Sequence, residues 1–228
     1  MSNPARITEL HDAREIATGV KLSDGSLFEF DRQKQTFPTW RVIAHHLALT
    51  NRWGGATEMP FSVAQHCCHV SDALIQTSKH PIAALAGLLH DAPETITGDP
   101  LSPVKQTLLY ASRGQLTDFH SHSIAVLFDR LNVPLPGAAI WREVKAQDMA
   151  AWVTEWRDLT REGNADRLFP LDIAPWKHRI TFWDWQKAEE QWLKRLEFIC
   201  VELGIGNPLT RDANHRIDRA PGASLGGH

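Results

Sequence analysis

The sequence predicts an all-α protein: a single helical bundle with a small N-terminal β or loop extension. Two observations predict this fold class. From Trp40 onward, apolar residues recur three and four residues apart, which is the spacing of amphipathic helices. The 228 residues are 43% hydrophobic, which is enough for one well-buried core. We therefore expect one domain over residues 37–206, an extension over 1–36 packed on it, and a disordered tail over 207–228.

The extension is expected to contain strand and loop structure. Gly19 and the pair Asp24-Gly25 are turn signals, and the segment SLFEF alternates between polar and apolar residues, so a small hairpin is predicted. The segment TWRVIAHHLAL then predicts a first helix from Trp40 to about residue 51.

The next elements place the first polar residues of interest. NRWGGATEMP is expected to be a loop, because it contains two glycines and a proline. Ser62 is the expected N-cap of a second helix, whose apolar face includes Val63, Cys67 and Val70. His66 belongs to the same face and is therefore expected to point inward.

Three further helical segments are expected. Pro81 begins a helix over residues 82–94, which the segment TGDPLSP ends. Residues 141–160 form a helix in which Val144, Asp148, Ala151, Trp152 and Glu155 share one stripe. A last helix ends at Gly204, and the polar residues after it, rich in glycine and proline, predict the tail.

Composition excludes several classes of partner. The formal net charge of −3 and the pI near 6.4 provide no basic field for a long nucleic acid. The N-terminal segment has no apolar signal region, and no stretch approaches the length of a membrane span, so we expect a cytoplasmic protein without a membrane partner. Cys67, Cys68 and Cys200 match neither a disulfide framework nor a zinc-ribbon spacing.

The segment AALAGLLHDAPE raises a question of chemistry, because an apolar helix leads directly into His90 and Asp91. Burying an uncompensated charge costs several kcal/mol, about as much as the net stability of a domain. A metal ion compensates such charges. Alone, His66 would be an ordinary hydrogen-bonded core histidine and Asp148 a partly exposed helix residue. Together, His66, His90, Asp91 and Asp148 supply two imidazoles and two carboxylates, a set suited to one divalent transition metal ion.

The order His, His-Asp, Asp in a helical chain resembles that of the HD-domain metal-dependent phosphohydrolases. The segments RWGG, SVAQH, LLHDAPETITGDPLSPVK and VKAQDMAAW resemble the branch that contains bacterial 5′-deoxynucleotidases, prophage HD hydrolases and phage dATP triphosphohydrolases. The resemblance covers residues 37–160 and, more loosely, the last helix. It implies that His66, His90, Asp91 and Asp148 bind one metal ion, which is manganese, cobalt, iron or zinc.

The resemblance also implies roles for five further residues. Glu94 is expected to transfer a proton, and Asp99 to orient either the attacking water or the sugar. Arg52 is expected to contact phosphate, and Trp53 to form a wall against the sugar that excludes a ribose 2′-hydroxyl. Lys105 is a second expected phosphate contact.

The implied activity is hydrolysis of the 5′ phosphoester of a 2′-deoxynucleotide. Attack at the α-phosphorus releases the deoxynucleoside from a dNMP or a dNTP, and the sequence leaves this choice, and the base, open. Two alternatives remain: an HD-type hydrolase of a signalling nucleotide, and a non-catalytic nucleotide-binding HD protein. The cyclic-dinucleotide branch is disfavoured, because the single tyrosine, Tyr110, lies in LLYAS and not in a Gly-Tyr-Pro signature. A homo-oligomer is expected from the resemblance.

Overall fold

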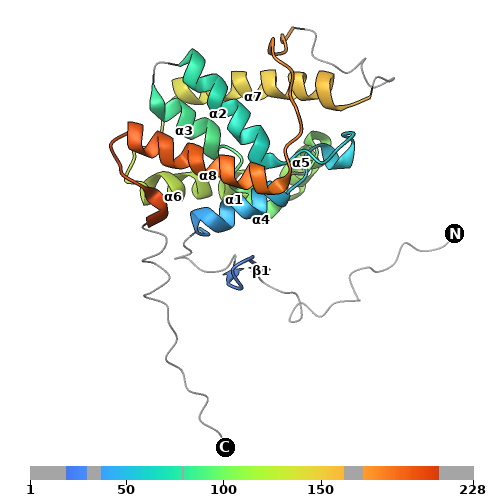
Figure 1. The fold of residues 1–228 in the computed structure, drawn as a ribbon. Coiled ribbons are helices and arrows are strands. Elements are labelled where there is room, and N and C mark those ends of the chain that lie inside the picture. The colour runs from blue at the N-terminus through green and yellow to red at the C-terminus, as the bar shows by residue number, and fades with distance from the viewer. Residues whose placement is uncertain (1–18, 30–36, 79, 162–171, 211–228) are drawn as a thin grey trace, which may run out of the picture.

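The predicted all-α architecture is confirmed by a computed structural model, which describes residues 19–29, 37–78, 80–161 and 172–210 (Figure 1). The helices of these ranges are α1 (Trp40–Leu49), α2 (Val63–Thr77), α3 (Pro81–Leu89), α4 (Glu94–Thr97), α5 (Ser102–Ala111), α6 (Gln115–Arg130), α7 (Ala138–Leu159) and α8 (Trp185–Glu202), with one 3-10 turn, η2 (Trp53–Gly55). Among them, no helix combines the length and the apolar character that crossing a membrane requires.

The predicted hairpin is present. Strands β1 (Gly19–Lys21) and β2 (Leu27–Glu29) pair antiparallel, with Val20 opposite Phe28. The buried Phe28 ring makes edge contacts with Phe37 and Phe119, so apolar packing holds the hairpin on the helical body. The rest of the predicted extension, and residues 211–228 of the predicted tail, lie outside the described residues. Leu209, within the predicted tail, packs against the core.

Side-chain caps explain where several helices begin. Ser62 caps α2 as predicted, because its hydroxyl accepts a hydrogen bond from the backbone N–H of Gln65 at 3.2 Å. Thr39 caps α1 and Asp184 caps α8 in the same way. Each cap satisfies one of the backbone donors that a helix leaves unpaired at its start.

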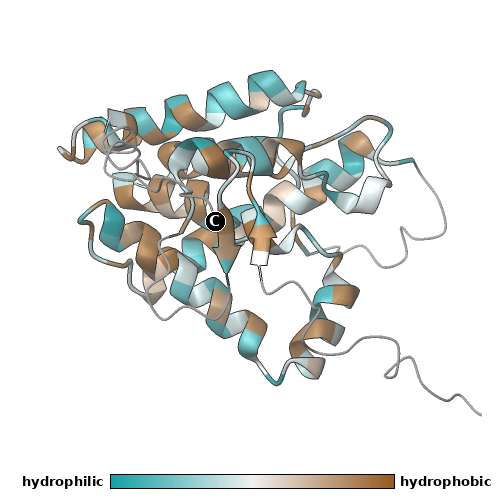
Figure 2. Ribbon diagram, turned by 90° about the horizontal axis from the view of Figure 1, so that it is seen from below, coloured by the Kyte–Doolittle hydropathy of each residue, from teal (hydrophilic) through white to brown (hydrophobic). Residues whose placement is uncertain are grey.

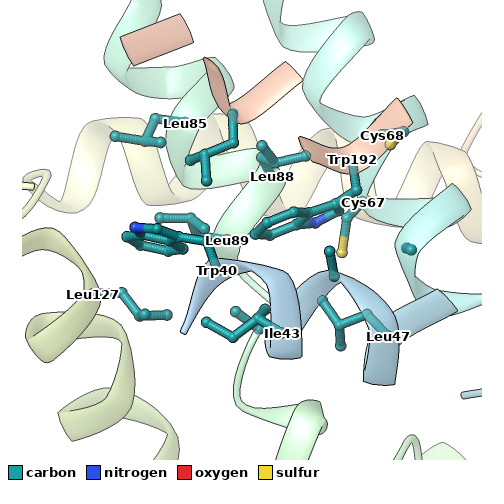
Figure 3. Close-up of a cluster of buried hydrophobic side chains, with 14 of the residues drawn as sticks. Trp40, Ile43, Leu47, Cys67, Cys68, Leu85, Leu88, Leu89, Leu127 and Trp192 are labelled. Atoms are coloured by element: carbon teal, nitrogen blue, oxygen red, sulfur yellow. The ribbon is translucent and has the colours of Figure 1, made fainter. Parts of the chain in front are cut away.

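The core lies where α2 meets α1, α3, α7 and α8. Figure 3 shows the indoles of Trp40 and Trp192 among leucines of α3, and both tryptophans are fully buried. Figure 2 shows hydrophobic and hydrophilic residues alternating along most helices, as expected for helices that bury one side. Because α2, α3 and α7 share this core, residues on their facing sides are held on rigid elements.

The predicted helix over residues 82–94 is wrong at its C-terminal end. Helix α3 ends at Leu89, and α4 begins separately at Glu94. Pro93 is the physical reason, because it has no N–H to donate and its ring clashes with the carbonyl four residues earlier. Tight turns replace the helix here, with Ala92 N donating to Leu89 O at 2.9 Å and Glu94 N to Asp91 O at 2.9 Å.

Residues 172–183 cross α7 and α2 before α8 begins, as the orange segment in Figure 1 shows. The fully buried Gln65 donates to Thr181 O at 2.6 Å and accepts from Trp183 N at 3.0 Å. Asp158 accepts from Ile180 N at 2.8 Å and from Arg179 Nη1 at 2.7 Å. These bonds tie the segment to the two helices.

Candidate metal centre

Three predicted metal ligands meet at one point. His66 comes from α2, His90 is the C-cap of α3, and Asp91 follows it. Their ligand atoms all lie within 4.8 Å of one another. His66 Nε2 is 3.3 Å from His90 Nε2 and 3.6 Å from Asp91 Oδ2, and His90 Nε2 is 3.2 Å from the same oxygen.

Asp148, the fourth predicted ligand, reaches the same point from α7. Its Oδ1 is 3.3 Å from His66 Nε2 and 3.8 Å from His90 Nε2. Its other oxygen accepts a hydrogen bond from Lys145 Nζ at 2.8 Å. The structure therefore brings Asp148 to both imidazoles, although these residues are far apart in the sequence.

Both imidazoles point the same nitrogen at the cluster. His90 Nδ1 lies 2.8 Å from the carbonyl oxygen of Gly87 and donates to it, and His66 Nδ1 donates to Glu155 Oε1 at 2.5 Å. With Nδ1 held in this way, Nε2 of each imidazole is the nitrogen left to bind a metal ion in place of a proton. Metal-binding histidines have this arrangement, in which the outer nitrogen donates to a carbonyl or carboxylate. The set thus fits a divalent transition metal ion, and its nitrogen and oxygen donors suit manganese, cobalt, iron and zinc alike.

The electrostatics of the cluster favour a bound cation. Burial alone lowers the pKa of His90, but the Asp91 and Asp148 carboxylates outweigh it and raise that pKa well above its ordinary value. Burial likewise opposes ionisation of Asp91 and Asp148, and the two imidazoles outweigh it, so the pKa of each carboxyl is lowered. Protons and a metal ion therefore compete for the same nitrogens.

Glu94 lies at the start of α4, beside the cluster. Its residue surface is only 2% exposed, and its Oε2 has no hydrogen-bond partner among the described residues. Its Oε1 accepts from Lys105 Nζ at 3.4 Å. Burial, with the Asp91 and Asp99 carboxylates, raises the pKa of Glu94 well above its ordinary value. A buried acid with one unpaired oxygen is an unfavourable arrangement for stability alone.

Arg52 connects the cluster to Asp99. Its Nη1 is 3.5 Å from Asp91 Oδ2 and 3.7 Å from Asp99 Oδ2. Gly98 precedes Asp99 with a φ of 69°, in the left-handed region, which turns the chain after α4. Burial raises the pKa of Asp99, although Arg52 opposes it. Both predicted residues therefore lie at the cluster.

Trp53 adopts a backbone φ of 62°, which is rare for a bulky residue and marks a strained position. Its ring stacks on that of Trp152, with the ring centroids 5.4 Å apart. It also makes an edge contact with the ring of Trp156, with the centroids 5.6 Å apart. Trp53 and Trp156, with residues 56–58 and 160–161, line a cavity of about 410 Å³. The rings of Trp53, Trp152 and Trp156 thus contact one another beside this cavity.

Glu155 was not predicted as a site residue. It is fully buried on α7 and accepts hydrogen bonds from His66 Nδ1, from Arg52 Nε at 3.2 Å and from Trp53 Nε1 at 3.0 Å. Burial opposes its ionisation, but Arg52 and His66 outweigh it and lower the pKa of Glu155. A sequence signal for it exists, because it lies two helical turns after Asp148 on the same stripe.

Comparison with known proteins adds little functional information. No family model matches the chain. An uncharacterized protein of Rhodobacter capsulatus is 35% identical over 136 residues, a match that covers 56% of this chain and 66% of that protein. The chain thus spans slightly less than two thirds of the relative's length.

Proposed function

We propose that the chain is a metal-dependent phosphohydrolase that cleaves the 5′ phosphoester of 2′-deoxynucleotides, either dNMPs or dNTPs. One observation carries the proposal: imidazoles and carboxylates from three helices converge beside Glu94, a buried acid with an unpaired oxygen. The resemblance of the motifs to those of HD-domain phosphohydrolases supports this chemistry.

In this proposal, His66, His90, Asp91 and Asp148 hold one divalent transition metal ion. When bound, the ion would supply Lewis acidity, which polarises a phosphate oxygen and activates a water molecule near neutral pH. The hydrogen bonds from the two Nδ1 atoms to Gly87 O and Glu155 keep the imidazoles oriented for that task.

Arg52 and Lys105 bind the phosphate. Glu155 holds the Nε of Arg52, so Nη1 remains on the side of Asp91, where a phosphate bound at the cluster would lie. The guanidinium geometry suits phosphate oxygens. Lys105 reaches the same region from α5, where its ammonium group already contacts Glu94.

Glu94 and Asp99 handle the protons. Hydrolysis forms a bond between water oxygen and the α-phosphorus and breaks the bond between that phosphorus and O5′. The attacking water loses a proton and O5′ gains one. Glu94 carries the proton at its unpaired Oε2, which has no competing partner among the described residues. Asp99 orients the water or the sugar.

Trp53 selects the sugar. Its ring is held by the stack on Trp152 and by the hydrogen bond to Glu155, so it forms a fixed wall beside the cluster. A fixed wall discriminates against an added hydroxyl by steric exclusion.

The test is a product assay on metal-loaded protein. Each dNMP, each dNTP and the matching ribonucleotides are incubated separately, and nucleoside, phosphate and triphosphate are quantified. Deoxynucleoside with phosphate marks a 5′-nucleotidase, and deoxynucleoside with triphosphate marks a triphosphohydrolase. Trp53→Ala is expected to lower the ratio of deoxynucleotide turnover to ribonucleotide turnover. Nucleotide binding without any release of nucleoside would replace the proposal with a non-catalytic nucleotide sensor.

A further inference from the structure

Glu155 contacts three residues that the proposed function assigns to different tasks. Its Oε1 faces His66 Nδ1 at 2.5 Å, and its Oε2 is shared by Arg52 Nε at 3.2 Å and Trp53 Nε1 at 3.0 Å. The side chain is fully buried, and these three bonds account for its burial as a charged group. Glu155 therefore joins the metal cluster to the predicted phosphate and sugar contacts.

We propose that Glu155 is a positioning residue, which sets His66 for metal binding and holds Arg52 and Trp53 for substrate binding. The inference rests on the proposed function for its meaning in catalysis. Its structural basis is the geometry of one carboxylate that accepts from a metal ligand, a guanidinium and an indole.

The orientation of His66 follows from the chemistry of a carboxylate. An ionised carboxylate only accepts hydrogen bonds, so the nitrogen that faces it must carry the proton. Nδ1 therefore carries a proton, and Nε2, 3.6 and 3.3 Å from Asp91 and Asp148, is the nitrogen left for a metal ion. Glu155 thus selects the form of His66 that can bind a metal ion.

The same carboxylate fixes the two substrate contacts. The Nε of Arg52 is held, so its Nη1 is directed at the Asp91 side of the site. The indole N–H of Trp53 is held, so the ring cannot rotate away from Trp152 despite its strained backbone. Metal and substrate groups are therefore positioned by one residue on α7.

An amide at position 155 cannot reproduce this arrangement. Glutamine has one accepting oxygen and one donating nitrogen, whereas the three neighbours are all donors. With its oxygen toward Arg52 and Trp53, the amide N–H₂ meets His66 Nδ1 and favours the imidazole form that is protonated on Nε2. If the amide oxygen instead faces His66, the amide N–H₂ faces the N–H groups of Arg52 and Trp53, which are also donors. Glu155→Gln must therefore weaken one function or the other.

The experiment compares Glu155→Gln with Asp158→Asn. Asp158 is a matched control, because it is a buried carboxylate one turn further on α7 that binds Arg157, Arg179 and Ile180 N instead of the cluster. Zinc affinity is measured by chelator competition, and KM and kcat are measured on the best deoxynucleotide. Loss of an outer partner of a metal ligand typically lowers metal affinity or activity by about 10- to 100-fold.

We expect Glu155→Gln to lose about 10- to 100-fold in zinc affinity, or to raise KM with zinc affinity kept, and Asp158→Asn to change neither. A purely structural role predicts equal changes in both variants, and that result would overturn the inference. Unchanged zinc affinity and KM in a folded Glu155→Gln protein would also overturn it.

A second measurement needs no variant at position 155. In zinc-loaded wild-type protein with ¹⁵N-histidine, the inference predicts a proton on Nδ1 of His66, assigned by loss of its signal in His66→Gln. A proton on Nε2 would overturn it. Absence of turnover in wild-type protein that still binds zinc would defeat the proposed phosphohydrolase but leave this measurement and the affinity comparison intact.

Discussion

At the scale of single residues, the carboxyl groups of the site differ in pKa because they have different neighbours. Asp91 and Asp148 face imidazoles, which lower the pKa of each carboxyl against the effect of burial. Glu94 and Asp99 are buried near other carboxylates, which raises the pKa of each. Environments that separate the pKa values of nearby carboxyls are typical of sites that use one group as a ligand and another as an acid.

This division leads to a prediction for Glu94→Gln. The variant keeps the size of the side chain but cannot carry the proton, so kcat should fall by about 10²- to 10⁴-fold. Zinc affinity should be unchanged. Turnover is measured by nucleoside release and zinc affinity by chelator competition. Glu189→Gln is the control, because among the described residues this side chain contacts His45 and no member of the cluster. A Glu94→Gln protein with the kcat of that control would remove Glu94 from the mechanism.

His69 allows a prediction of pH dependence. It lies on α2 beside Trp176 and Trp183, and its Nε2 accepts a hydrogen bond from Gln65 Nε2 at 3.2 Å. Burial lowers the pKa of His69 to about 4 from an ordinary value of 6.5. The unfolded chain therefore binds more protons between these two values, and stability is lost as the pH falls through this range.

The measurement is the free energy of unfolding of wild type and His69→Gln at pH 7 and pH 5. Because of His69, the free energy of unfolding of the wild type should fall by about 2 kcal/mol between pH 7 and pH 5, and the variant should not show this fall. The other histidines are common to both proteins, so the difference between them isolates His69. Equal losses in both proteins would show that His69 is not held neutral.

At the scale of elements, the close contact of α2 and α3 fixes the distance between His66 and His90. A Cβ added at Gly87 would lie 2.4 Å from Leu74 Cδ1 and 3.3 Å from Val70 Cγ1, both fully buried on α2. Gly87→Ala should therefore cost about 1–3 kcal/mol by overpacking, of which better helix propensity recovers at most about 1 kcal/mol.

The same variant should weaken zinc binding, because moving α3 away from α2 separates the two imidazoles. Urea unfolding and chelator competition are the measurements. Gly137→Ala is the control, since its φ of −73° suits alanine and an added Cβ would meet nothing within 4 Å. A Gly87→Ala protein as stable as this control, with wild-type zinc affinity, would contradict the role assigned to the contact.

The elements were predictable where amphipathic pattern and capping agree. Helix α2, with Ser62 as its cap, is such a case. Helices α5 and α6 were not assigned from the sequence. The reason is clear for α5, which has no buried residue and exposes Val104 and Leu108, so its pattern reflects no core contact. The apolar pattern of residues 82–94 does not reveal the break before Glu94, because that break comes from the missing N–H of Pro93 and the clash of its ring with the preceding turn.

The candidate site was predictable to a different extent. The order of four residues in the sequence was sufficient to predict that they converge, since each lies in or beside a helix: His66, His90, Asp91 and Asp148. Glu155 was not identified, because its significance lies in contacts with residues about 90 and 100 positions away. Such contacts depend on how α7 packs on α2, which the pattern of one helix does not specify.

At the scale of the whole molecule, the cluster connects three helices that are distant in sequence. An ion bound by the folded protein alone adds RT ln(1 + [L]/Kd) to the free energy of unfolding, about 2.7 kcal/mol at a hundred times Kd. We predict this gain for zinc with the wild type and its loss with Asp148→Ala. Glu143→Ala, an exposed acid on the same helix, should keep the gain. Equal gains in both variants would exclude Asp148 as a ligand.

The most direct test of the central claim, that the cluster is a catalytic metal centre, is a titration of activity with metal. Chelator-treated protein receives increasing amounts of manganese, cobalt, iron or zinc, and nucleoside release from deoxynucleotides is followed at each step. A catalytic metal centre should give negligible release without metal, a rise that ends at one ion per chain, and no rise in His66→Ala. Release that is independent of added metal, or no release with any of the four ions, would contradict it.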